Sequence, residues 1–411
     1  MSPRTGPTRR AGRAAWRAAV LSCALALLAA ACSGGDARKR QSPQALAAAR
    51  AKADLRLQQD HESAIVRNLA RVKAEHDDFA AGRVAAPPVV DVLIVSGGGD
   101  WGAFGAGFLK GWGTVPPGAM ARPVFDVVTG VSTGALIAPF AFLGDEASID
   151  QVVHLYRNPK KNWVKRRSLF SLFGAQSFAE IPGLERELSK ALDLPVLQRI
   201  VDAGSGGRLL LVSTTNIDTE EMQVWDIVEQ ARSAVNDGTS HRVRQVLLAS
   251  SALPGVFPPR EIDGVLYVDG GVTGNILYGG RGARRDEDSF VARWRQRYPD
   301  AQVPRIRYWV IFNNEVRWPP ETVQPRWSSV LMKSSTASTR AATLNSMRQL
   351  FLLANLARLK HEADVEVRFV AVPDGWTPPS PSAFDRKTMN ALADLGEAMG
   401  KDPDSWRTEA P

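Results

Sequence analysis

The sequence predicts an α/β fold with a mostly parallel central sheet and helices on both faces. Two similar units carry this prediction, each made of a β-branched run, a glycine-rich turn and a small-residue segment. The first unit has its apolar run at residues 89–95 and its glycines at 97–99, and the second has its run at 124–129 and its glycines at 130 and 134. Strands that alternate with helices form parallel sheets, because each helix returns the chain across a face of the sheet.

Three further apolar runs of strand length extend the predicted sheet, at residues 209–213, 265–268 and 308–312. The chain has 411 residues, of which 44% are hydrophobic, enough for one large core or two modest ones. No internal repeat is visible. We expect the α/β domain to occupy residues 89–316 and residues 317–411 to form a C-terminal helical region, with a helix around 341–359, that packs on the domain or covers it.

The N-terminus resembles a targeting signal rather than part of the fold. Five arginines and no acid precede or accompany an apolar run at residues 18–28, which is shorter than the roughly 20 residues a membrane-spanning helix needs. Residues 1–31 therefore predict a bacterial lipoprotein signal, with cleavage before Cys32 and lipid on that thiol. Cleavage as an ordinary secretory signal after Ala31 is the alternative. The other cysteine, Cys23, would leave with either signal, so no intrachain disulfide is expected. If Cys32 carries lipid, the protein is expected in the bacterial cell envelope, anchored to a membrane.

Residues 32–88 are expected to form a tether and a polar helix. The stretch 33–36 contains Ser and Gly and is typical of a flexible tether. From about residue 43 to residue 80 the chain is rich in Ala, Leu, Lys, Arg, Glu and Gln, a composition that favours a helix. Its apolar period is brief, which favours a stalk or a helix lying on the domain over a coiled coil.

The net charge of +8 gives no support for nucleic-acid binding. Five of the positive charges lie in residues 1–31, which leaves +3 for the rest of the chain. The remaining Lys and Arg are interleaved with Asp and Glu, so no basic face for a phosphate backbone is predicted.

Ser132 is the predicted nucleophile. It lies at the centre of Gly130-Val131-Ser132-Thr133-Gly134, with an apolar run before it and a small-residue segment after it. This is the pattern of a nucleophile elbow, in which flanking glycines relieve crowding around a serine on a tight strand-to-helix turn. The start of the following helix also offers backbone N–H groups to an oxyanion.

A glycine-rich turn, Gly97-Gly98-Gly99, follows the first predicted strand. Such a turn serves either as a phosphate cradle or as an oxyanion hole. A dinucleotide site would require an acidic residue about 20 positions further on, where Pro116 and Pro117 stand instead, and a P-loop would end in Gly-Lys-Ser or Gly-Lys-Thr. The glycine-rich turn is therefore predicted to form an oxyanion hole.

Asp269 ends the run 265–268 and precedes Gly270 and Gly271. A carboxylate at a strand end, with space cleared beside it, is suited to accept a proton from a serine hydroxyl. By itself an Asp-Gly pair is an ordinary turn signal.

Taken in order, the glycine loop, the Gly-x-Ser-x-Gly elbow and the Asp-Gly-Gly turn resemble the patatin-like phospholipases. The stretch from Ala249 to Pro259 and Asn275, close behind Asp269, also look like this family. The resemblance implies a three-layer patatin-like fold and hydrolysis of lipid carboxylic esters, with no metal or cofactor. It also implies a Ser132–Asp269 dyad that forms an acyl-enzyme and an oxyanion hole at Gly97, Gly98 and Gly99.

One residue departs from the family pattern, and two other functions remain open. The family loop usually has Arg or Lys before its last glycine, whereas this chain has Trp101. Loss of that cation puts phospholipid preference in doubt and is compatible with an inactive lipid-binding envelope protein. A conventional Ser-Asp-His esterase is the other alternative, and His361 is its candidate because it alone follows both Ser132 and Asp269.

Overall fold

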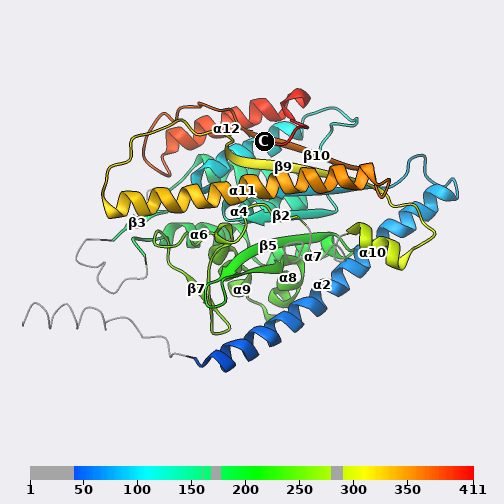
Figure 1. Ribbon diagram of the computed structural model, residues 1–411, viewed down its shortest axis with the longest axis horizontal. Coiled ribbons are helices and arrows are strands. Elements are labelled where there is room, and N and C mark those ends of the chain that lie inside the picture. The colour runs from blue at the N-terminus through cyan, green and yellow to red at the C-terminus, as the bar shows by residue number, and fades with distance from the viewer. Residues whose placement is uncertain (1–40, 161, 168–176, 279–289) are drawn as a thin grey trace, which may run out of the picture.

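The computed structural model describes residues 41–160, 162–167, 177–278 and 290–411, and its centre is one large mixed sheet (Figure 1). Five strands of the sheet are parallel in the order β10-β9-β1-β2-β5, and β8 continues it antiparallel to β5, with β7 beyond; β6 also pairs with β5. The strands are β1 Val89–Val95, β2 Val127–Val131, β3 Lys165–Arg166, β4 Ala179–Glu180, β5 Leu209–Asn216, β6 Glu221–Asp226, β7 Arg260–Ile262, β8 Val265–Asp269, β9 Arg305–Glu315 and β10 Val365–Val372. The predicted α/β fold with a mostly parallel sheet is confirmed.

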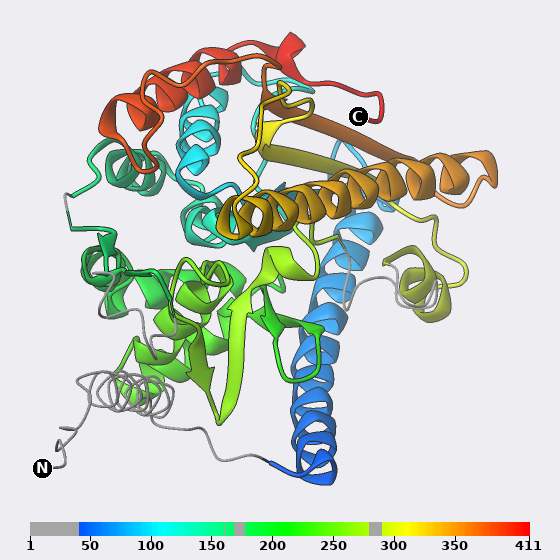
Figure 2. The ribbon, with the colours of Figure 1, turned by 60° about the vertical axis from the view of Figure 1, so that its left-hand side comes forward.

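Helices cover both faces of the sheet, as expected. They are α2 Pro43–Ala80, α3 Gly102–Trp112, α4 Thr133–Leu143, α5 Glu146–Arg157, α6 Pro182–Ala191, α7 Leu194–Gly204, α8 Ile227–Asp237, α9 His241–Ser250, α10 Phe290–Arg297, α11 Trp327–Leu359 and α12 Arg386–Gly400, with short 3₁₀ turns η1 Gly99–Trp101, η3 Gly270–Val272 and η5 Pro403–Ser405. Among the described residues there are three buried apolar clusters. The first joins the sheet to helices α3 to α9 and α12, the second joins it to α2, α10 and α11, and a small third one lies between α2 and strands β2, β5 and β6. In Figure 2, α11 crosses the sheet and α2 runs beside it.

The central strands are largely apolar because both of their faces are buried. Alternate residues of β1 point to opposite cores, with Leu93 and Val95 in one and Val92 and Ile94 in the other. This is the pattern of a parallel strand between two helical layers.

The strand register brings three loops to one edge of the sheet. Val95, the last residue of β1, pairs with Gly130 in β2, so the glycine loop and the serine elbow leave the sheet side by side. In the next pairings Val131 lies beside Ser213, and the antiparallel β8 places Asp269 beside Thr214 of the same strand β5. The end of β8 therefore meets the ends of β1 and β2, although β8 runs the opposite way.

Helix α2 covers the residues for which a polar helix was expected, and it lies on the domain. Ser42 caps its N-terminus by accepting a hydrogen bond from the backbone N–H of Ala45. Leu69 and Val72 are buried in the second core, and the Asn68 side chain donates to the carbonyl of Gly207. The predicted signal, the tether 33–36 and Cys32 lie outside the described residues. None of the helices that the structure describes has the length and hydrophobicity to span a membrane.

The C-terminal region differs from the expected helical layer. Strand β10 joins the main sheet in parallel with β9, so residues 317–411 complete the sheet instead of only covering it. Its sequence, Val-Glu-Val-Arg-Phe-Val-Ala-Val, alternates at first as a half-exposed edge strand does. Helix α11 also begins earlier than expected, at Trp327. Its first half was not predicted because it is rich in Ser and Thr and has little apolar period.

Candidate active site

Ser132 lies at the sharp turn between β2 and α4. Its backbone has φ 54° and ψ −123°, a conformation that is strained for a residue with a side chain and costs on the order of 1–3 kcal/mol. Glycine is required at positions 130 and 134 because other backbone atoms lie too close for a side chain. A Cβ on Gly130 would lie 2.4 Å from the carbonyl oxygen of Gly134, and a Cβ on Gly134 would lie 2.1 Å from the carbonyl oxygen of Val95. The local geometry is the strained elbow that the Gly-x-Ser-x-Gly pattern predicts.

Two neighbouring serines hold this strained turn in place. The backbone N–H of Ser132 donates to Ser250 Oγ at 2.9 Å, and Ser250 Oγ donates in turn to the carbonyl of Ser213 at 2.7 Å. Ser251 Oγ donates to the carbonyl of Ser132 at 3.1 Å. Both serines lie in the stretch from Ala249 to Pro259 that resembles the family, but their sequence pattern predicts no role for them. Their role follows from the end of α9 lying against the elbow.

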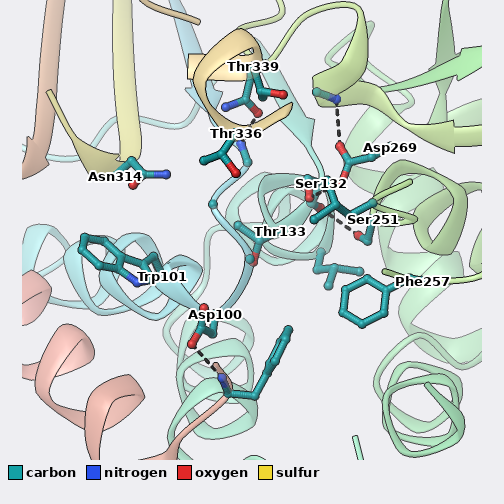
Figure 3. A pocket seen from close by; sticks show the side chains of 18 of the residues that line it. Asp100, Trp101, Ser132, Thr133, Ser251, Phe257, Asp269, Asn314, Thr336 and Thr339 are labelled. Carbon is teal, nitrogen blue, oxygen red and sulfur yellow. Dashed lines mark hydrogen bonds between the residues drawn. The ribbon is translucent and has the colours of Figure 1, made fainter. Parts of the chain in front are cut away.

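The Ser132 hydroxyl donates a hydrogen bond to Asp269 Oδ2 at 2.7 Å (Figure 3). The other carboxylate oxygen, Oδ1, accepts from the backbone N–H of Gly271 at 2.8 Å, and the side chain is 4% exposed. Burial raises the pKa of Asp269 to about 6, although the hydrogen bonds from Ser132 and Gly271 act in the opposite direction. A carboxylate with a raised pKa is a stronger base than an ordinary aspartate.

A cavity of about 370 Å³ opens over this pair. One wall is largely apolar and comes from α4, α5, α6 and the loop after α9; it includes Leu136, Phe140, Val152, Leu155, Leu188 and Phe257. The opposite wall comes from the end of β9 and from α11 and carries hydroxyl and amide groups, among them Asn314, Thr336 and Thr339 (Figure 3). Ser132 and Asp269 line the cavity between the two walls.

The model of the family described as patatin-like phospholipase matches residues 93–279. This part of the chain, a little under half of its length, is a patatin-like phospholipase domain. The matched residues include both Ser132 and Asp269. Among solved structures, the chain is similar to VipD from Legionella pneumophila, with a TM-score of 0.34 and 13% sequence identity over 79% of this chain and 68% of that chain. The comparison with curated proteins gave no match.

In the glycine loop of the patatin-like domain, two of the three N–H groups are without an acceptor among the described residues. All three glycines line the cavity, but the N–H of Gly97 donates to Asn275 Oδ1 at 2.7 Å. The N–H groups of Gly98 and Gly99 have no acceptor among the described residues. Gly97 was expected to be one of the oxyanion donors. In the structure its N–H instead donates to Asn275 and holds the loop in place.

Asn313 supports the same loop from β9. Its backbone N–H donates to Ser96 Oγ at 2.9 Å, and its side-chain amide donates to the carbonyl of Ser96 at 2.8 Å. A Cβ on Gly98 would lie 2.2 Å from the carbonyl oxygen of Asn313, so only glycine fits at this position. Asn313 was not predicted as a site residue. The one signal for it is an Asn-Asn pair directly after an apolar strand.

Trp101, in the place of the usual cation, belongs to an aromatic contact at the cavity. Its ring stacks on that of Trp318 with centroids 6.0 Å apart and meets the ring of Trp376 edge-on at 5.3 Å. Beside it, Asp100 Oδ2 accepts from the backbone N–H of Phe384 at 2.7 Å. The loop is thus held by the C-terminal region, which the family match does not cover.

The structure does not bring a histidine to Ser132. No histidine is among the described residues that line the cavity. His361 follows the end of α11, and Leu359 lies 16 residues after Thr343, the last cavity residue of that helix, about 24 Å along the helix axis. The geometry therefore does not favour the Ser-Asp-His alternative with His361. Nor do the described residues contain a group of three or more His, Cys, Asp or Glu side chains placed to hold a metal ion.

Proposed function

We propose that this protein is a serine acyl hydrolase that cleaves lipid carboxylic esters through an acyl-enzyme on Ser132, with Asp269 as its base. The patatin-like phospholipase domain supports lipid acyl hydrolysis in general terms. The observation that carries the finer proposal is the 2.7 Å hydrogen bond from the Ser132 hydroxyl to the buried Asp269 carboxylate.

In the first half of the proposed reaction, Ser132 Oγ attacks the ester carbonyl carbon while its proton passes to Asp269 Oδ2. The carbonyl oxygen becomes an oxyanion beside the N–H groups of Gly98 and Gly99, each contributing roughly 2.7 to 4 kcal/mol to the transition state. Collapse of the tetrahedral intermediate breaks the ester C–O bond, and the alcohol leaves with the proton held by Asp269.

In the second half, water attacks the acyl-enzyme and gives its proton to Asp269. The same two N–H groups stabilise the second oxyanion. Collapse releases the fatty acid and returns the proton from Asp269 to Ser132 Oγ. One carboxylate thus serves as base and then acid in each half, as microscopic reversibility requires.

The two walls of the cavity fit the two parts of a lipid ester. The apolar wall around Phe140, Val152 and Leu188 suits an acyl chain, because such a chain gains about 0.8 kcal/mol for each buried methylene. The hydroxyl-bearing wall of α11, with Thr336 and Thr339, suits the alcohol part of the ester.

Ester turnover by matched serine variants tests this function. Ser132→Ala should lose turnover of both a soluble short-chain ester and a phospholipid, whereas Ser251→Ala, which removes a neighbouring hydroxyl in the same cavity, should keep a measurable rate. A wild-type protein that binds lipid but hydrolyses no ester would instead favour the inactive lipid-binding alternative. Full activity in Ser132→Ala would show that a different residue is the nucleophile.

We further propose that the protein is a lipoprotein of the bacterial cell envelope, anchored through lipid on Cys32. The support is the sequence pattern before Cys32, since these residues lie outside the described structure. Cys32→Ser should move the protein from the membrane to the soluble fraction, while Cys23→Ser, in the segment expected to be cleaved, should not. Membrane association that survives Cys32→Ser would refute this anchor.

A further inference from the structure

Large apolar side chains are exposed where α11 begins. Trp327, Val330 and Leu331 are 73%, 48% and 59% exposed. Their spacing of three and four residues puts them on one side of the helix. Single exposed apolar residues are common on protein surfaces, but a cluster with an exposed tryptophan marks an interaction site. We call Trp327, Val330 and Leu331 the α11 patch.

The α11 patch continues into the mouth of the cavity. Met332, the next residue of the helix, is 40% exposed and lines the cavity, as does the partly exposed Trp318 in the preceding loop. Ser335, one turn beyond Leu331, lines the cavity as well. The patch therefore extends the α11 wall of the cavity outward to the protein surface.

Cations outnumber acids in the sequence around the start of α11, although the Asp374 carboxylate accepts from the backbone N–H of Arg317. Helix α11 has no Asp or Glu in its 33 residues. From residue 316 to residue 333 there are three cations, Arg317, Arg326 and Lys333, and one acid, Glu321, which pairs with Lys333. Arg317 and Arg326 are exposed and form no ion pair within the part of the chain that the structure describes.

We propose that the α11 patch docks on an anionic lipid bilayer, so that the cavity over Ser132 opens directly onto the membrane that holds its substrate. The proposal rests on the proposed lipid hydrolase function. Exposed Trp and Leu beside cations are the features with which helices bind in the plane of an anionic bilayer surface. A lipid ester then reaches the cavity along an apolar path. A second copy of the chain fits less well, because a two-fold contact would bring the same cations together.

Vesicle binding by two sets of variants of the same helix tests the docking. All proteins are the full chain with Cys32→Ser, so that lipid on this thiol contributes nothing. The test variant carries Trp327→Gln, Val330→Gln and Leu331→Gln. The control carries Leu352→Gln, Leu356→Gln and Leu359→Gln, which remove three apolar side chains of 57%, 40% and 76% exposure near the other end of α11.

The test variant should bind vesicles of phosphatidylcholine and phosphatidylglycerol about tenfold more weakly or worse, because binding scales with the apolar area inserted. The control should bind like the parent. Turnover of a soluble short-chain ester should be the same in all three, since none of the six side chains lines the cavity. Arg317→Gln and Arg326→Gln should each weaken binding to these vesicles about fivefold, with little effect on pure phosphatidylcholine.

Unchanged vesicle binding in the test variant would overturn the proposal. So would a wild-type dimer that the test variant abolishes without a change in vesicle binding, because the α11 patch would then be a self-association surface. If no ester is hydrolysed by any protein while vesicle binding still depends on the patch, the docking stands and the proposed hydrolase function fails.

Discussion

Ser132 Oγ and Asp269 Oδ2 are joined by a 2.7 Å hydrogen bond although their residues lie 137 positions apart. The sheet produces this contact, since Ser132 follows β2, Asp269 ends β8, and β5 pairs with both strands. The Asp269 carboxylate is buried and accepts from Ser132 and from the N–H of Gly271, and within the described residues no cation pairs with it.

The pH dependence of turnover should report the raised pKa of Asp269. Catalysis requires the ionised carboxylate, and burial raises its pKa to about 6, so kcat/KM should fall as the pH drops through about 6 and reach a plateau above it. The measurement is a pH–rate profile on a soluble ester. A plateau that extends well below pH 5 would mean that an ordinary carboxylate, or none, is the base.

Asp269→Asn should make the protein inactive but more stable at alkaline pH. Because the pKa is about 6 in the folded chain against an ordinary 3.8, the folded state binds more protons than the unfolded state between these values, and stability falls as the pH rises through this window. The free energy of unfolding of Asp269→Asn should therefore exceed that of the wild type by roughly 1–3 kcal/mol at pH 8 and by little at pH 4. Urea unfolding of both proteins at the two pH values measures it. Lower stability of Asp269→Asn at pH 8 would contradict the burial argument.

His361→Gln should leave both turnover and the pH–rate profile unchanged. His361 lies beyond the end of α11, far from the cavity residues of that helix. The two variants are compared because a pH–rate profile alone does not tell a histidine base from an aspartate with a raised pKa: an imidazole also titrates near pH 6 to 7. Loss of activity in a folded His361→Gln protein would restore the conventional triad.

Gly98→Ala should reduce kcat by about a hundredfold or more, because the added Cβ would collide with the backbone of Asn313 and displace the oxyanion donors. Gly118→Ala is the matched control: a Cβ there meets only the carbonyl oxygen of Pro116, at 3.9 Å. Steady-state kinetics on a soluble ester compares the two. Equal rates for both variants would show that this loop does not stabilise the oxyanion.

Local patterns were enough to predict the parallel sheet and to single out Ser132 and Asp269, which the structure joins by a hydrogen bond. The β-branched run of β1 and the Gly-x-Ser-x-Gly spacing around Ser132 are patterns of a few neighbouring residues, and such patterns can be read from the sequence. Asp269 was found because a carboxylate and two glycines follow a strand directly. Its hydrogen bond to Ser132 needed the sheet order, which no local pattern contains.

The supporting contacts of the glycine loop could not be predicted in the same way. Asn275 accepts from Gly97 across 178 positions, and Asn313 donates to the Ser96 carbonyl across 217 positions. A buried amide side chain has no periodic signature, so its partner is known only once the strands are in register. For the same reason the sequence did not reveal that the N–H of Gly97 is occupied.

Covalent labelling with a fluorophosphonate tests the central claim most directly, because the reagent reports an activated serine without requiring the natural substrate. Peptide mapping of the labelled protein should find one modified residue, Ser132. Labelling should disappear in Ser132→Ala, fall steeply in Asp269→Asn and persist in His361→Gln. A label on a different serine, or undiminished labelling in Asp269→Asn, would contradict a Ser132 nucleophile activated by Asp269.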